Sequence, residues 1–274
     1  MAMPTFERFT VESGGNVGIS VMKTGAGPAL LLIHGALLNA TLSWAAVLPS
    51  LAGHFTVYAM DRRGRAPSGD AEDYSISLEA GDIVRVIEAI GRPVIVLAHS
   101  YGALATLEAL DDLKTGVAQL ILYEPPFALA PLGPEAEKVM LDMESALQAN
   151  DREKIATVFL RDQIGAPPER LEAFRSSPIW PIVLQIASTL PREARAVNTP
   201  RDLAERLARC NIPTTMLLGS ETQGRMRDNS IFVSKTIPES RLMMLEGQGH
   251  AAMMEAPDFF AGKIVEIAQS AALG

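Results

Sequence analysis

The sequence predicts an α/β fold in which a mainly parallel sheet is flanked by helices and interrupted by a helical insertion. Short apolar runs of strand length alternate with segments of helical periodicity, and this alternation stops after Pro126 and resumes at Thr214. Strand–helix–strand repeats at this spacing imply right-handed crossovers between parallel strands. We therefore expect a sheet domain formed by residues 1–126 and 206–274, and a helical cap formed by residues 127–205.

The expected strands are short runs bounded by turn residues. The first two flank the turn at residues 13–15 (Ser-Gly-Gly) and predict a hairpin. The next run, at residues 29–33, is apolar throughout, which is typical of a strand buried on both faces of a sheet. Further strands are predicted at residues 55–59, 94–98, 117–123, 214–218 and 241–245.

Composition narrows the classes of function. The 274 residues carry a formal net charge of −8, so we expect no nucleic-acid partner, because phosphate binding needs clustered Lys and Arg. We also expect no membrane partner, because no apolar run approaches the roughly 20 residues of a spanning helix. Residues 1–12 lack the apolar core of a secretory signal, and a lone cysteine, Cys210, fits a reducing compartment, so we expect a cytoplasmic protein. The scattered histidines and the lack of a glycine-rich nucleotide motif predict no metal and no cofactor.

The segment AHSYG at residues 98–102 lies between a predicted buried strand and a predicted helix. A sharp turn there strains the backbone of Ser100 and presents its hydroxyl at the carboxyl end of the sheet. Small residues are needed two positions before and after the serine, where the strand and the helix approach closely. The usual pattern is G-x-S-x-G, and Ala98 is the smallest departure from its first glycine. We predict that Ser100 is a nucleophile.

A serine hydroxyl needs an adjacent base to become a nucleophile. Of the four histidines, only His250 follows Ser100, in the segment GQGH directly after the strand predicted at residues 241–245. Glycines allow this loop to fold over the sheet edge and aim the imidazole at Ser100. We predict that His250 is the general base, in the chain order Ser…acid…His. His34 and His99 are expected to serve turns.

A carboxylate should orient the imidazole and stabilise its charged form. Two glutamates stand at predicted strand ends. Glu221 follows the strand at residues 214–218, and Glu124 follows the strand at residues 117–123. Both are candidates for the acid.

Together these motifs resemble the α/β-hydrolase superfamily, over nearly the whole chain apart from the insertion. The resemblance is carried by LIHG at residues 32–35, DRRGR at 61–65, AHSYG at 98–102 and GH at 249–250. It implies an α/β-hydrolase fold and favours Glu221 as the acid, although the usual acid is an Asp one position later, where this chain has Thr222. Some members take the acid from the preceding strand end, which corresponds to Glu124.

The resemblance also implies where an oxyanion would be held. One donor would be the backbone N–H of Tyr101, and the other would be that of Ala36, after the His-Gly pair. Leu37 and the Tyr101 side chain are expected to line the substrate pocket. The adjacent arginines of the DRRGR segment are expected to anchor their loop through bonds to carboxylates and backbone, with no catalytic role.

These expectations describe a serine hydrolase of the esterase or lactonase type that acts on a small-molecule substrate through an acyl-enzyme. The predicted cap has no evident cationic clamp for a carboxylate or phosphate, so we expect a small to medium, largely apolar carboxylic ester or lactone. The alternatives are cofactor-free C–C bond hydrolysis, perhydrolysis or a lyase reaction on the same triad. A non-catalytic ligand receptor is disfavoured by the apparently complete triad.

Overall fold

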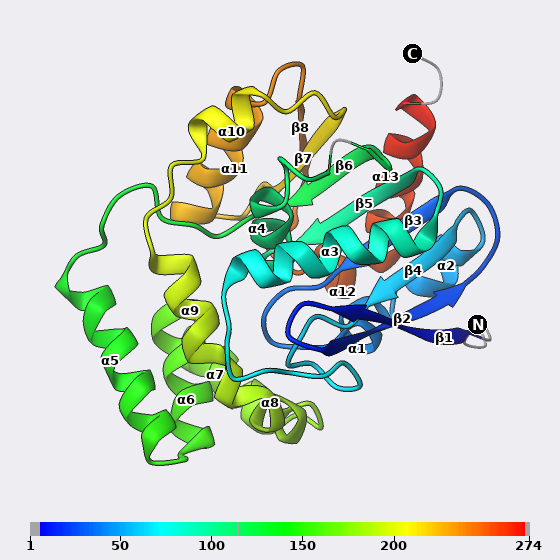
Figure 1. Ribbon diagram of the computed structural model, residues 1–274. Helices are drawn as coiled ribbons and strands as arrows, with labels where there is room; N and C mark the ends of the chain where they lie inside the picture. The colour runs from blue at the N-terminus through cyan, green and yellow to red at the C-terminus, as the bar shows by residue number, and fades with distance from the viewer. Residues whose placement is uncertain (1–5, 114, 272–274) are drawn as a thin grey trace. The chain divides into compact units, whose positions relative to one another are not determined.

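The computed structural model describes residues 6–113 and 115–271, which divide into two units. The first comprises the described residues of Met1–Gly35, Asn39–Pro126 and Asp202–Gly274, and the second comprises Ala36–Leu38 and Phe127–Arg201. An eight-stranded sheet with the order β1-β2-β4-β3-β5-β6-β7-β8 runs through the first unit (Figure 1). Its strands are β1 (Glu7–Ser13), β2 (Val17–Thr24), β3 (Ala29–Ile33), β4 (Thr56–Met60), β5 (Val94–His99), β6 (Val117–Tyr123), β7 (Thr214–Gly219) and β8 (Arg241–Leu245).

Strand pairing makes the sheet mainly parallel. β1 and β2 form an antiparallel hairpin, and β2 pairs antiparallel with β4. The remaining neighbours, from β4 through β3 to β8, all pair in parallel. Every residue of β3 and β4 is buried, which accounts for their continuous apolar sequences. The predicted α/β fold with a mainly parallel sheet is confirmed.

Helices cover both faces of this sheet. In Figure 1, α3 and α4 cross in front of it, and α13 lies behind it. The helices of the first unit are α1 (Ala40–Trp44), α2 (Leu48–Ala52), α3 (Ile76–Ile90), α4 (Tyr101–Glu108), α10 (Ala204–Ala208), α11 (Gly224–Thr236), α12 (Ala252–Glu255) and α13 (Pro257–Ala271). The longest of the front helices, α3, begins after Ser75, whose side chain accepts the Leu78 N–H, and ends at Gly91 with a left-handed φ of 69°.

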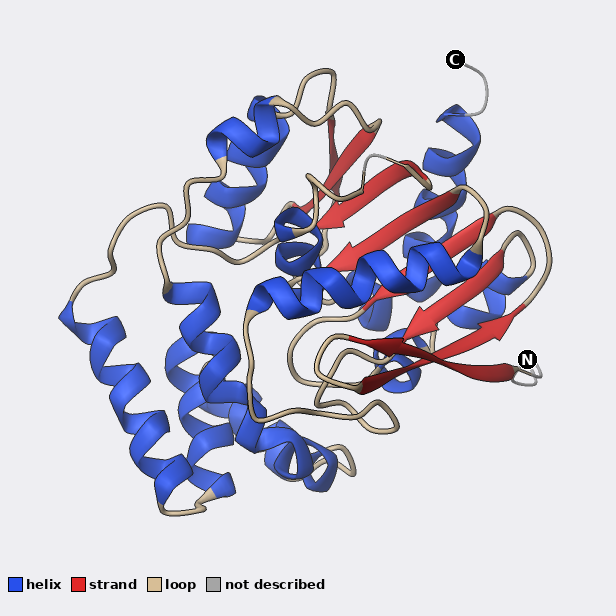
Figure 2. Ribbon diagram, in the orientation of Figure 1, coloured by secondary structure: helices blue, strands red, loops and turns tan. Residues whose placement is uncertain are grey.

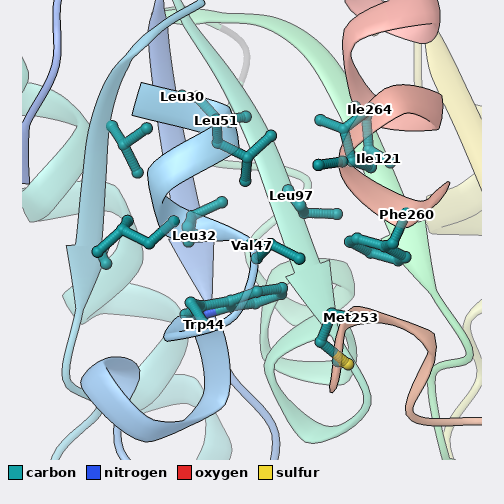
Figure 3. Close-up of a cluster of buried hydrophobic side chains, with 14 of the residues drawn as sticks. Leu30, Leu32, Trp44, Val47, Leu51, Leu97, Ile121, Met253, Phe260 and Ile264 are labelled. Atoms are coloured by element: carbon teal, nitrogen blue, oxygen red, sulfur yellow. The ribbon is translucent and has the colours of Figure 1, made fainter. Parts of the chain in front are cut away.

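The core behind the sheet joins residues of the strands to the helices α1, α2, α12 and α13 (Figure 3). Leu30 and Leu32 of β3 face it, as expected for residues two apart on one strand. Trp44 of α1 and Phe260 of α13 belong to the same cluster and are fully buried. Burial of such side chains contributes about 1.5–3 kcal/mol each, so this core holds the strands whose carboxyl ends carry the site.

The second unit is helical, as Figure 2 shows by its blue segments between β6 and β7. It contains α5 (Pro134–Gln148), α6 (Arg152–Val158), a π-helix (Phe159–Gln163), α7 (Pro168–Arg175), α8 (Trp180–Ile186), a 3₁₀ turn (Ala187–Thr189) and α9 (Leu190–Asn198). Its own core buries Met143, Phe159 and Trp180. The unit ends at Arg201, so α10 belongs with the sheet and not with the insertion. Among the residues that the structure describes, no helix is long and apolar enough to cross a membrane.

Candidate active site

Ser100 lies in a sharp turn between β5 and α4. Its φ of 53° and ψ of −121° form a conformation that non-glycine residues rarely adopt, at a cost of about 1–3 kcal/mol. The neighbouring strand holds the turn, because the Ser100 N–H donates to the Tyr123 carbonyl at 2.8 Å. A Cβ on Gly102 would lie 2.6 Å from the His34 carbonyl oxygen, so the helix approaches β3 too closely for a side chain. Ala98, the departure from the usual glycine, is fully buried and fits at the other small position.

His250 lies in the loop after β8, and its Nδ1 is 2.6 Å from Oε2 of Glu124. An ionised carboxylate only accepts hydrogen bonds, so Nδ1 carries the proton and Nε2 is left as the basic nitrogen. The imidazole is 30% exposed, whereas the carboxylate is fully buried. This is the arrangement in which a buried carboxylate orients a histidine and favours its charged form.

Glu124 is held by the end of the neighbouring strand. It follows β6 with a positive φ of 49°, which is rare for a glutamate. Its Oε1 accepts the Gly219 N–H at 2.8 Å and the Thr222 hydroxyl at 2.6 Å. Together with His250, these groups give a buried carboxylate three donors, which is what an ion removed from water requires.

Glu221, which the family resemblance favoured as the acid, is not the carboxylate at His250. Its side chain is exposed, and its backbone N–H donates to the Gln248 carbonyl at 3.0 Å. Thr222, at the position where the family usually has Asp, donates its hydroxyl to Glu124 instead. The loop after β7 therefore supplies donors, and the end of β6 supplies the carboxylate that the sequence left open as the alternative.

The loop that carries His250 is fixed by side chains from two strand ends. Nε2 of His99 lies 2.9 Å from the His250 carbonyl oxygen, and the Tyr123 hydroxyl donates to the Gly249 carbonyl. The Gln248 carbonyl accepts the N–H of Glu221, as described above. The carbonyl groups of three successive residues, 248–250, thus accept hydrogen bonds. These bonds fix the loop, which reduces the entropy lost when the imidazole is oriented for the reaction. The sequence had placed His99 in a turn and had assigned no part to Tyr123.

The Tyr101 side chain, predicted to line the substrate pocket, is buried among other side chains. It is 1% exposed, the Arg62 guanidinium lies over its ring at 4.6 Å from the centroid, and its hydroxyl bonds to that of Tyr74. Ala36 and Leu37 follow directly after Gly35 and are partly buried. A Cβ on Gly35 would lie 3.1 Å from the Cβ of Ser100, so the backbone before Ala36 packs against the serine.

The two adjacent arginines are anchored to carboxylates on α3. Nη1 of Arg62 donates to both oxygens of Glu79, at 2.9 and 2.7 Å. Arg63 makes two parallel bonds to Asp82, each 2.7 Å long. All four side chains are at most 2% exposed. These contacts are those of loop anchors.

His34 is a buried neutral histidine in the same region. Its Nε2 accepts the Arg62 backbone N–H at 3.1 Å, so Nδ1 carries the proton and donates to the Gly35 carbonyl at 2.8 Å. Burial, followed by the charges of Arg62 and Arg65, lowers the pKa of His34 well below its ordinary value. Among the described residues, no group of three or more His, Cys, Asp or Glu side chains is arranged to hold a metal ion.

The chain is similar to known proteins over much of its length. Residues 30–263 match the sequence model of the alpha/beta hydrolase family. The chain is 31% identical over 226 residues to a pimeloyl-[acyl-carrier protein] methyl ester esterase of Methylococcus capsulatus, covering 70% of this chain and 86% of that protein. It is 32% identical over 126 residues to an N-formylmaleamate deformylase of Pseudomonas putida, covering 43% of this chain and 47% of that protein.

A solved structure extends the likeness to the whole fold. An alpha/beta hydrolase from Sphaerobacter thermophilus superposes with a TM-score of 0.82 at 31% identity, over 94% of this chain and 99% of that chain. The chain therefore belongs to the alpha/beta hydrolase family, and it is a hydrolytic enzyme that acts on small molecules.

Proposed function

We propose that the protein is a serine hydrolase that cleaves a small to medium, largely apolar carboxylic ester or lactone through an acyl-enzyme. Ser100 is the nucleophile, His250 the general base and Glu124 the acid that orients it. The observation that carries this proposal is the 2.6 Å contact between His250 Nδ1 and the buried Glu124 carboxylate, at the sheet edge where the strained Ser100 turn lies.

The chemistry follows from the protonation of His250. With the proton on Nδ1, Nε2 accepts the proton of Ser100 as Oγ forms a bond to the substrate carbonyl carbon. Glu124 stabilises the imidazolium that results. The imidazolium then returns its proton to the leaving alkoxide as the ester C–O bond breaks. Water, deprotonated by the same nitrogen, then attacks the acyl carbon. The bond from that carbon to Ser100 Oγ breaks, the imidazolium returns the proton to Oγ, and the acid is released.

The tetrahedral intermediate carries an oxyanion that needs preorganised donors. The backbone N–H of Tyr101 and that of Ala36 are the proposed donors. Their support is the family membership together with the packing of Gly35 against Ser100. Each donor of this kind is worth about 10²–10³-fold in kcat.

One relative supports an ester as the bond that is cleaved. The Methylococcus relative is a methyl ester esterase, so an ester is the first substrate class to test. The Pseudomonas relative is a deformylase, which makes an amide the appropriate competing substrate. A C–C bond hydrolase would instead cleave a β-diketone.

A fluorophosphonate probe tests the nucleophile, and a substrate panel tests the bond. We expect the probe to label Ser100, with no labelling of Ser100→Ala. Initial rates with p-nitrophenyl acetate, butyrate and octanoate, a γ-lactone, an N-formyl amide and a β-diketone should be highest for an ester or the lactone. A mass shift mapped to another residue, or turnover by Ser100→Ala, would refute the proposed nucleophile.

A further inference from the structure

We propose that Arg62 is a positioning residue that holds both backbone donors of the oxyanion hole. This inference rests on the proposed function, because it concerns the groups that would bind the oxyanion. Arg62 lies on the loop after β4, and the sequence predicted only that it anchors that loop.

The first contact of Arg62, through Nη2, is with the peptide group that contains the Ala36 N–H. Nη2 of Arg62 donates to the Gly35 carbonyl at 3.2 Å, and His34 Nδ1 donates to the same oxygen at 2.8 Å. The Gly35 carbonyl and the Ala36 N–H belong to one planar trans peptide, in which they point in opposite directions. Two donors that fix the direction of the carbonyl therefore also fix the direction of that N–H.

The second contact of Arg62 is with the side chain of Tyr101, whose backbone N–H is the other proposed donor. The guanidinium lies over the Tyr101 ring, 4.6 Å from its centroid. Tyr74 completes this contact, because its hydroxyl donates to Glu79 Oε1 at 2.7 Å and therefore accepts from the Tyr101 hydroxyl. Glu79 in turn holds Nη1 of Arg62, so the ring of Tyr101 is held on its face and at its hydroxyl by one connected cluster.

Charge and burial make this cluster rigid. The side chains of Arg62 and Glu79 are 1% and 2% exposed, and the pair is charge-assisted. A buried pair of this kind gives up its partner only at a large cost, so neither side chain changes rotamer readily. A stiff connection between the two donors is what preorganised oxyanion stabilisation requires, since misplacement by about 1 Å costs about 10²-fold.

The chain provides a matched control in the next residue. Arg63 is as buried as Arg62 and is paired as tightly with Asp82, but its other contacts are to the carbonyls of Gly14 and Leu78. Arg62→Lys and Arg63→Lys therefore make the same chemical change in equally buried ion pairs. Only the first change removes a contact with Gly35 and Tyr101.

The experiment measures kcat, KM and the inhibition constant of a trifluoromethyl ketone, which forms an anionic hemiketal with a serine nucleophile. We expect Arg62→Lys to lower kcat by about 10–100-fold with KM within threefold, and to weaken the ketone by the same factor as kcat/KM. Arg63→Lys should lower thermal stability similarly but change kcat by less than threefold. Tyr74→Phe, which removes only the hydroxyl, should lower kcat by about threefold to tenfold and weaken the affinity for the ketone in parallel.

Two outcomes would overturn the inference in distinguishable ways. If Arg62→Lys and Arg63→Lys lowered kcat equally, or if kcat fell while the affinity for the ketone stayed constant, the role of Arg62 would be structural and the proposed function would stand. If Ser100→Ala turned over the ester or bound the ketone as tightly as the wild type, the proposed function itself would fail, and the inference with it.

Discussion

Two buried glutamates in the sheet-containing unit have different kinds of partner. Glu124 is bonded to His250, which is titratable and 30% exposed, and to Thr222. Glu79 is bonded to Arg62, which is permanently charged and buried. We call these groups the Glu124 cluster (Glu124, His250, Thr222) and the Glu79 cluster (Glu79, Arg62, His34). In the proposed mechanism the first cluster moves a proton, and in the proposed role of Arg62 the second holds backbone groups in place. Burial of a carboxylate is common to both glutamates, so our choice of Glu124 as the acid rests on its histidine partner.

The largest effect should come from Glu124→Gln. The amide has nearly the shape of the carboxylate but donates as well as accepts, so it favours the wrong tautomer of His250 and cannot stabilise the imidazolium. We expect kcat for an ester to fall by about 10⁴-fold, with a smaller change in KM. Steady-state kinetics of the purified variant against Glu221→Gln, whose side chain is exposed, measures this. Loss of turnover in Glu221→Gln with retention in Glu124→Gln would reverse the assignment.

Substitution in the Glu79 cluster should lower the stability of the fold. Glu79→Gln leaves the Arg62 guanidinium buried without its counter-charge, so we expect the free energy of unfolding to fall by about 3–5 kcal/mol. Urea denaturation measures it. Glu108→Gln is the control, since Glu108 pairs with an arginine that is 27% exposed and should cost at most about 1 kcal/mol. Equal losses in the two variants would contradict the distinction.

Thr222→Val tests the support of the acid. It removes one donor to the buried carboxylate while keeping the volume, so it should lower the free energy of unfolding by about 1.5–3 kcal/mol and lower kcat by about tenfold. Thr222→Ser keeps the hydroxyl and should restore most of both. If the valine variant were as active and as stable as the serine variant, the hydroxyl would not support Glu124.

The two clusters also mark how far sequence patterns reach. The buried strands, the Ser100 turn and the His250 loop each have a local signature: an apolar run, small residues around a serine, and glycines before a histidine. Each signature involves neighbours along the chain, and the mainly parallel sheet followed from them.

The acid depended on contacts between separate strands. Glu124 and Glu221 both follow predicted strands. They differ in two features of the structure: Glu124 has a positive φ, and the Thr222 hydroxyl donates to its carboxylate. The positive φ of Glu124 has no signature in one sequence. The contacts of the Tyr101 side chain could not be predicted for the same reason, because its partners Tyr74 and Arg62 are distant along the chain. Thr222, a hydroxyl residue at the position where the family usually has the acid, was the one signal in the sequence that the loop after β7 donates a hydrogen bond to the carboxylate.

The histidines of the two clusters provide the smallest and sharpest test. His34 has a lowered pKa, so below about pH 6.5 the unfolded chain binds a proton that the folded chain does not. The free energy of unfolding should therefore fall as the pH falls, by up to about 1.4 kcal/mol per pH unit from this residue, until the pH reaches the pKa of the folded state. His34→Asn loses that contribution, so its stability deficit relative to the wild type should shrink between pH 7.5 and 5.5. His54→Asn, at an exposed histidine, is the control substitution. Parallel curves for His34→Asn and the wild type would mean that His34 accepts a proton in the folded state. It could not then accept the Arg62 N–H, and the arrangement of the Glu79 cluster described above would be wrong.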